Sequence, residues 1–234
     1  LQGQEAGGND TSVINRLDRL PGVNSVSNGG LGSNTTTQIR GLASKYVGVV
    51  VNGIDVTDPS STQTQFNFGG LMPAGIDRIE VLKGSQSALY GSEAIGGVIN
   101  ITTFTPDELG FSGDFQVEAG SYDTYSSGLN AGYRGERGFV AFSYGRVETD
   151  GFSAQSFNDE KDGFEQTTAD IRAEYEVTDT LTFGAALRYR DGVVAFDRGP
   201  EDVTGDNFYT ETGARVFARL ITGAVTHTFS YSYF

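Results

Sequence analysis

The sequence predicts an α+β domain at residues 1–105, followed by antiparallel, membrane-spanning β-strands at residues 106–234. The chain has 33 glycines, which are too many for a helical protein, and its sixteen Phe and eleven Tyr suit many short strands. After about residue 106, apolar and polar residues alternate with a period of two. No run of about eighteen apolar residues is present, so a transmembrane helix is not expected.

The first domain is predicted to be a small α/β unit with two polar loops. Val13, Ile14 and Leu17 have helical spacing, and Pro21-Gly22 stops that helix. The apolar run at 46–51 is typical of a buried strand, and Asn52-Gly53 after it predicts a tight hairpin turn. Further short strands are expected at 23–26 and 37–40, and the polar loops at 27–36 and 57–67.

Residues 77–101 are predicted to join the two regions. Ile79 and Val81 alternate with polar residues until Gly84 ends the strand, and 87–89 is too short for an independent helix. Glycines then lead into a second apolar strand at 98–101. After that strand the alternating pattern begins.

The second region is predicted to contain about seven strands of roughly ten residues, a length that crosses a bilayer at a tilt. The polar side of the alternation carries full charges, as in Arg188 and Arg190, and Tyr and Phe recur near strand ends. Connections at 134–138, 178–180 and 222–223 are short, whereas those expected at 149–163 and 191–210 are long. Apart from the first connection, around Tyr122-Asp123, this is the arrangement of short periplasmic turns and long external loops that outer-membrane barrels have.

The net charge of −14 argues against nucleic-acid binding, which needs Lys and Arg to neutralise phosphates. The acidic balance indicates either solubility alone, or calcium or ligand capture in carboxylate-rich loops. The chain has no cysteine, hence no disulfide or thiolate metal site. An enzyme is not expected: the one histidine, His227, lies in an apolar alternating run, and Glu174 and Glu176 lie beside Arg172, as in an ion pair.

A longer motif resembles a known family. Arg-Ile-Glu-Val-Leu-Lys-Gly-Ser at 78–85 and Ala-Leu-Tyr-Gly-Ser-Glu-Ala-Ile-Gly-Gly-Val-Ile-Asn-Ile at 88–101 resemble the end of the plug domain of TonB-dependent outer-membrane receptors, especially the cobalamin (vitamin B12) receptor group. The motifs around Pro21, Arg40 and Asn52 precede it in the expected order. The resemblance implies a barrel of about 22 strands, of which this chain supplies the first seven. It also places the TonB-binding segment before Leu1.

The resemblance implies particular site residues. Arg40 and Arg78 would lock the plug to wall glutamates. Calcium, as the one expected cofactor, would bind Glu160, Asp162 and Asp191, although Ser153 stands where a further carboxylate is expected. Residues of the two plug loops that would touch the ligand are Ser33, Asn34, Thr35, Thr36, Thr57, Gln63 and Gln65.

The implied function is uptake of a scarce metal chelate, most simply cobalamin, across the bacterial outer membrane. The implied partners are TonB, outer-membrane lipid and the chelate itself. A siderophore receptor of the same fold fits the same residues. So does a β-rich surface protein that binds calcium or a partner without transport.

Overall fold

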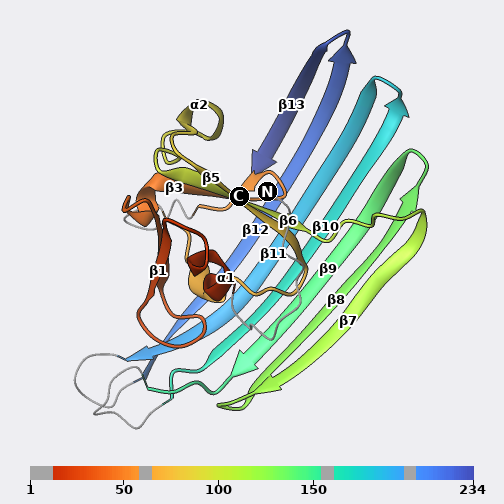
Figure 1. The fold of residues 1–234 in the computed structure, drawn as a ribbon. Helices are drawn as coiled ribbons and strands as arrows, with labels where there is room; N and C mark the ends of the chain where they lie inside the picture. The colour runs from red at the N-terminus through yellow and green to blue at the C-terminus, as the bar shows by residue number, and fades with distance from the viewer. Residues whose placement is uncertain (1–12, 58–64, 154–160, 198–203) are drawn as a thin grey trace.

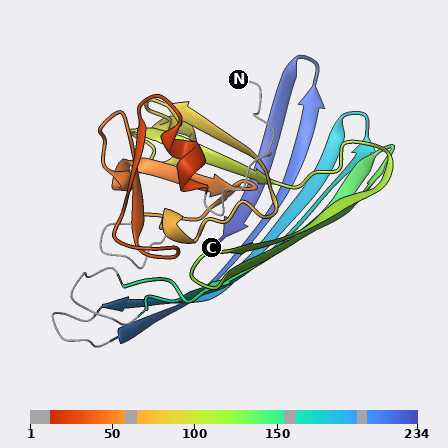
Figure 2. The same ribbon diagram turned by 60° about the horizontal axis from the view of Figure 1, so that its bottom comes forward.

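The computed structural model describes residues 13–57, 65–153, 161–197 and 204–234. These residues form two parts, a small α/β domain and a large curved antiparallel sheet (Figure 1). The small domain lies against one face of the sheet, as the rotated view also shows (Figure 2). We call residues 13–103 the plug and the large sheet the wall, and the wall face toward the plug its inner face.

The plug has a four-stranded sheet, a two-stranded sheet and four short helical segments. Its elements are α1 (Ile14–Asp18), β1 (Val23–Ser27), β2 (Thr35–Ile39), η1 (Ser44–Tyr46), β3 (Val47–Val51), β4 (Ile54–Asp55), η2 (Phe68–Gly70), β5 (Ile76–Lys83), α2 (Ser87–Tyr90) and β6 (Gly97–Thr103).

The four-stranded sheet has the order β4-β3-β6-β5, with β3 parallel to β6. All five residues of β3 are buried, as the continuous apolar run predicts. Val49 faces Ile99 and Val51 faces Ile101, and these four side chains lie in the plug core. Asn52 and Gly53, both with positive φ, form the predicted tight turn that pairs Val51 with Ile54.

The wall has seven antiparallel strands in sequence order, as predicted. They are β7 (Gly110–Gly120), β8 (Thr124–Gly135), β9 (Gly138–Thr149), β10 (Phe164–Thr178), β11 (Leu181–Asp197), β12 (Thr204–Thr222) and β13 (Val225–Tyr233). Two-residue turns join β8 to β9, β10 to β11 and β12 to β13, and all three lie at one end of the wall (Figure 1). The domain boundary at 105/106 stays a prediction; it falls in the segment 104–109, which joins β6 to β7.

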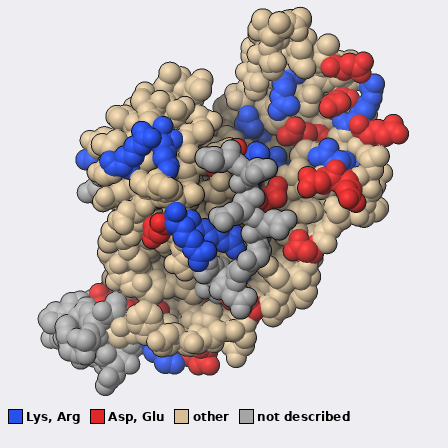
Figure 3. All heavy atoms as spheres, in the orientation of Figure 1, with Lys and Arg blue, Asp and Glu red and all other residues tan. Residues whose placement is uncertain are grey.

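Alternation along each wall strand separates two faces. On β11, Arg188 and Arg190 are 7% and 3% exposed on the inner face, whereas Leu187 is 52% exposed on the outer face. At this level of the wall the outer face carries apolar side chains and the inner face carries charged ones, which gather beside the plug (Figure 3).

The predicted position of the second long loop is wrong. Asp191 was expected to begin it, yet β11 continues to Asp197 and β12 begins at Thr204. Asp191 lies inside the sheet opposite Thr210, whose Oγ1 donates to its Oδ2 at 2.7 Å. The strand was expected to end at Arg190, but backbone pairing between β11 and β12 continues past Asp191, because its side chain can point away from the sheet.

Among the helices of the described residues, none is long and apolar enough to cross a membrane.

Candidate binding site between the plug and the wall

The first polar loop of the plug, residues 28–34, connects β1 to β2. Its shape is held by hydroxyl groups: Ser33 Oγ donates to Gly30 O at 2.7 Å and lies 3.0 Å from Ser27 Oγ. Asn34 is exposed, and Ser33 and Thr36 are half-buried. These three residues can meet a ligand at the loop surface.

Thr35 differs from its neighbours in the predicted set. Its side chain is fully buried, and its hydroxyl donates to Ser27 Oγ at 3.0 Å and contacts Ser33 O at 3.1 Å. Its backbone N–H donates to Asn67 Oδ1 at 2.9 Å. Thr35 therefore shapes the loop from below and does not face solvent.

In the second polar loop, too, one predicted residue is buried and another is partly accessible. Thr57 is buried, and its hydroxyl contacts Asp55 Oδ1 at 2.5 Å. Gln65 is half-buried and accepts a hydrogen bond from Ser44 Oγ at 2.6 Å. Gln63 lies outside the described residues. Of the two described residues, only Gln65 has partial access to solvent.

Wall residues hold the first loop in place. Gly32 has φ +80°, and a Cβ there would overlap the ring of Phe164 on β10. Gly30 lies against the ring of Phe152, which is itself 5.2 Å from the ring of Tyr122. A hydrophobic cluster joins the plug and the wall at this point, formed by Leu31, Met72, Val147, Phe164, Val194 and Tyr209. The loop therefore rests on the wall with no space to spare at Gly32.

A polar network holds the segment after the second loop. Gln166 on β10 donates from Nε2 to Gly70 O at 2.7 Å, and its Oε1 accepts from Arg190 Nε at 2.7 Å and Tyr209 OH at 2.8 Å. Arg190 also pairs with Glu211 at 3.3 Å. Gln166 is only 2% exposed, so each of its polar atoms depends on these partners.

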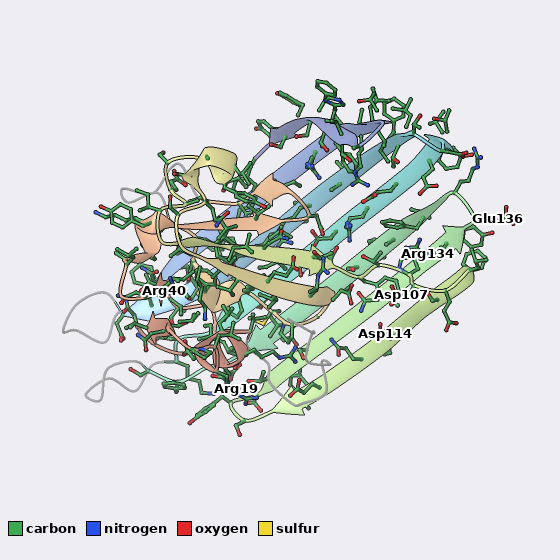
Figure 4. All side chains as sticks on the ribbon, turned by 45° about the horizontal axis from the view of Figure 1, so that its top comes forward. Arg19, Arg40, Asp107, Asp114, Arg134 and Glu136 are labelled. Atoms are coloured by element: carbon green, nitrogen blue, oxygen red, sulfur yellow. The ribbon has the colours of Figure 1, made fainter. Side chains whose placement is uncertain are left out.

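Two wall arginines bind the segment that leads from the plug into the wall, residues 103–106. Arg172 Nη1 donates to Thr103 O at 3.1 Å and to Thr105 Oγ1 at 2.7 Å. Arg134 Nε donates to Pro106 O at 2.5 Å. Both guanidinium groups lie over the ring of Phe139, at 5.5 and 5.2 Å from its centre. Figure 4 shows Arg134 where the segment carrying Asp107 reaches the wall.

Arg40 and Arg78, which were predicted to lock the plug to the wall, do not take part in the wall contacts described above. Arg78 pairs with Glu80 of its own strand at 3.7 Å, and both side chains are about half exposed. Arg40 is exposed, has φ 52°, and lies far from Arg134 and Glu136 (Figure 4). Their pairing with wall glutamates stays a prediction. In the described part of the chain, wall side chains reach plug carbonyl groups at Gly70 and Thr103.

These wall contacts were not found from the sequence. The alternation did place the arginines of β10 and β11 on the polar face, but nothing in it shows which plug carbonyl groups they meet. Asp77 on β5 lies near the same contacts. Burial raises the pKa of its carboxyl group, and the charge of Asp107 raises it further, against the opposing effects of Arg78 and Arg172.

The two predicted calcium ligands that the structure describes, Asp162 and Asp191, are not brought together. Glu160 lies outside the described residues, and Asp162 is 8% exposed. Gly163, the residue after Asp162, accepts a hydrogen bond at its O from Ala195 N. Ala195 lies four residues beyond Asp191 on β11, which corresponds to about 13 Å along the strand. Within the described ranges, no group of three or more His, Cys, Asp or Glu could hold a metal ion.

Comparison with known proteins agrees with this architecture. Residues 4–98 match the family model of the TonB-dependent receptor plug domain. Solved structures with a similar fold include the FrpB iron transporter from Neisseria meningitidis (TM-score 0.74, 14% identity, covering 95% of this chain and 37% of that one). The siderophore receptor PirA from Acinetobacter baumannii is similar as well (TM-score 0.70, 16% identity, covering 95% and 37%). Residues 4–98 therefore belong to the TonB-dependent receptor plug family, and the chain as a whole is similar to TonB-dependent receptors of the bacterial outer membrane.

Within that family, the sequence is similar to the vitamin B12 transporters. It is 36% identical over 190 residues to the vitamin B12 transporter BtuB of Photobacterium profundum, covering 80% of this chain and 30% of that protein. It is 30% identical over 196 residues to BtuB of Vibrio vulnificus, covering 80% and 31%. The chain thus spans about a third of the curated relatives it matches. These relatives are transporters and not enzymes.

Proposed function

We propose that this chain forms the plug and the first wall strands of a receptor that takes up cobalamin with energy supplied through TonB. The observation that carries the proposal is the 36% identity to a vitamin B12 transporter across both plug and wall. The geometry supports it, since the plug loop with exposed Asn34 and half-buried Ser33 rests on the wall at Phe164. An amide-rich ligand would find hydroxyl and amide groups there.

The proposed mechanism is binding followed by displacement of the plug. The ligand binds at the first loop and at Gln65, near the long-loop end of the wall. A pull on the segment before the plug then moves the plug away from Gln166 and Phe164. The contacts to break are hydrogen bonds and packing, which can form again after each cycle. No nucleotide is required, because the energy comes through the partner protein.

Ligand affinity of the intact receptor tests the proposed cargo. Isothermal titration with cyanocobalamin and with ferric enterobactin separates the two classes of chelate. Asn34→Ala is expected to weaken cyanocobalamin binding about fivefold, the value of one lost hydrogen bond. Asn24→Ala is the matched control, because Asn24 is also exposed but lies at the other end of β1. Tight binding of ferric enterobactin alone would make the receptor a siderophore receptor.

Coupling to TonB is tested separately from binding. Deleting the residues before Val13 in the intact receptor is expected to abolish energised uptake of labelled cobalamin while its binding stays unchanged. Uptake that survives the deletion would refute coupling through that segment.

We also propose that calcium binds at the connection 150–163. The proposal now rests on Glu160 and Asp162, because Asp191 lies on the outer face of β11. Glu160→Ala with Asp162→Ala is expected to remove the effect of a calcium chelator on ligand affinity. Asp191→Asn is the matched control and should leave that effect intact. Equal affinity of the unmodified receptor with and without the chelator would exclude calcium.

A further inference from the structure

An open trough of about 1250 Å³ crosses the outer face of the wall near its short turns. It extends from the β8–β9 turn to β13, and the side chains that line it are mostly apolar. The trough lies on the side of the wall away from the plug, so neither the candidate binding site nor the plug contacts use it.

The floor of the trough is one row of small side chains across the sheet. Ala173 on β10 faces Ala185 on β11, Val140 lies beyond Ala173, and Val216 lies beyond Ala185. The next row on the same face lies two residues further along each strand, toward the short turns. It carries the large side chains of Tyr175 and Phe183.

Large side chains also bound the trough on its other sides. Ile171 and Leu187 face each other in the row toward the long-loop end, and Leu187 is half exposed. Tyr133 and Tyr231 close the two ends of the row. A row of small residues between rows of large ones leaves a shallow apolar channel across the outer face.

The rim of the trough carries opposite charges. Glu136 and Arg137 form the β8–β9 turn and line the opening, and Glu136 lies at that end of the wall in Figure 4. Arg137 donates to Asp179 Oδ1 at 3.3 Å and to Val177 O at 3.4 Å. Its side chain is 53% exposed and that of Asp179 is 93% exposed. A guanidinium group has five N–H donors, so these two contacts leave others for a further acceptor.

We propose that the trough binds one zwitterionic glycerophospholipid from the leaflet at the short-turn end of the wall. An acyl chain lies over Ala173 and Ala185, the phosphate binds Arg137, and the ammonium group binds Asp179 or Glu136. The outer face of a membrane-spanning wall borders the bilayer, and the turns lie at the level of the head groups. The occupant must therefore combine an apolar chain with a head group of both charges, which a phospholipid with a phosphoethanolamine head provides.

Native mass spectrometry of the intact receptor, purified in detergent and titrated with palmitoyl-oleoyl phosphatidylethanolamine, tests the proposal. One lipid per receptor is expected, bound more tightly than phosphatidylglycerol, which lacks the ammonium group. Ala185→Phe fills the floor of the trough and should remove the bound lipid. Arg137→Ala changes only a surface turn, so folding is preserved, and it should weaken retention about tenfold.

Two matched controls separate this site from general contact with lipid. Ala169→Phe adds the same ring to the outer face of β10 outside the trough, and Arg146→Ala removes a similarly exposed, ion-paired arginine at the other end of β9. Both variants should retain the lipid. Three results would each overturn the proposal: equal loss in the controls, equal binding of phosphatidylglycerol, and a receptor dimer that covers this face without lipid.

Discussion

Gln166 of the wall donates a hydrogen bond from Nε2 to the carbonyl oxygen of Gly70 in the plug, at 2.7 Å. The same side chain accepts from Arg190 and Tyr209 through its Oε1, so one buried amide connects the plug to two wall strands. The plug is thus held at Gly70 by a hydrogen bond whose donor is itself fixed by two wall partners.

Gln166→Ala is expected to loosen this part of the plug. The substitution leaves Gly70 O without its wall partner and removes the acceptor of Arg190 Nε and Tyr209 OH, in a place that water does not reach. The free energy of local opening around Gly70 should fall by about 2 kcal/mol, measured by amide hydrogen exchange of Gly70, Leu71 and Met72. Gln116→Ala is the control, since Gln116 is exposed on β7; equal exchange in the two variants would contradict the network.

Gly32→Ala should weaken ligand binding by displacing the first plug loop. Gly32 and Gly41 have nearly the same φ, +80° and +79°, so Ala costs about 1 kcal/mol of backbone strain at either position. At Gly32 the added Cβ also overlaps Phe164, whereas at Gly41 it meets nothing within 4 Å. Cyanocobalamin affinity should therefore fall for Gly32→Ala and stay unchanged for Gly41→Ala.

A second substitution distinguishes the overlap from strain alone. Adding Phe164→Ala to Gly32→Ala removes the ring that the new Cβ meets, so part of the lost affinity should return. If the double variant binds no better than Gly32→Ala, the position of the loop does not depend on Phe164.

Arg172→Ala is expected to loosen residues 103–105, where the chain leaves the plug. Its guanidinium binds Thr103 O and Thr105 Oγ1, and a hydrogen bond from a charged donor contributes about 1.5–3 kcal/mol. Hydrogen exchange at residues 103–105 should rise by at least about tenfold. Arg219→Ala removes another guanidinium near Glu174, at 3.9 Å, and serves as the control. Matching increases in both variants would show that the charge of Glu174, and not the plug contact, controls the exchange.

The carboxyl group of Asp77 predicts a pH dependence. Burial and Asp107 raise its pKa above 3.8, so the folded plug binds this proton more tightly than the unfolded chain. Its contribution to stability is therefore present at low pH and is lost as the pH rises through the raised pKa. Asp77→Asn should remove this decrease.

The control for Asp77 is Asp18→Asn at an exposed position on α1. Thermal unfolding of the intact receptor between pH 3.5 and 7 measures the difference. A difference between Asp77→Asn and the unmodified receptor that does not vary with pH would refute the assignment.

Local patterns determined the elements and their faces. The apolar run at 46–51 predicted a strand buried on both sides, because only a core can cover both faces of such a strand, and β3 lies at Val47–Val51. Asn52-Gly53 predicted the turn, because both positions require a positive φ that these residues tolerate. Strict alternation at 169–177 and 181–189 predicted wall strands with one apolar face, and the structure has β10 and β11 there.

Only the tertiary structure decided which side chains meet. Thr35 and Thr36 are the same residue type, yet Thr35 is buried and Thr36 is only half-buried, because in the pairing of β1 with β2 adjacent residues point to opposite sides. The prediction placed Asp191 in a loop, whereas it lies in β11, because β11 stays paired with β12 as far as Asp197. Which plug carbonyl Gln166 reaches depends on how the plug packs against the wall, and that packing joins residues 96 positions apart. Sequence periodicity carries no information on such a distance, so the site between plug and wall emerged from the fold alone.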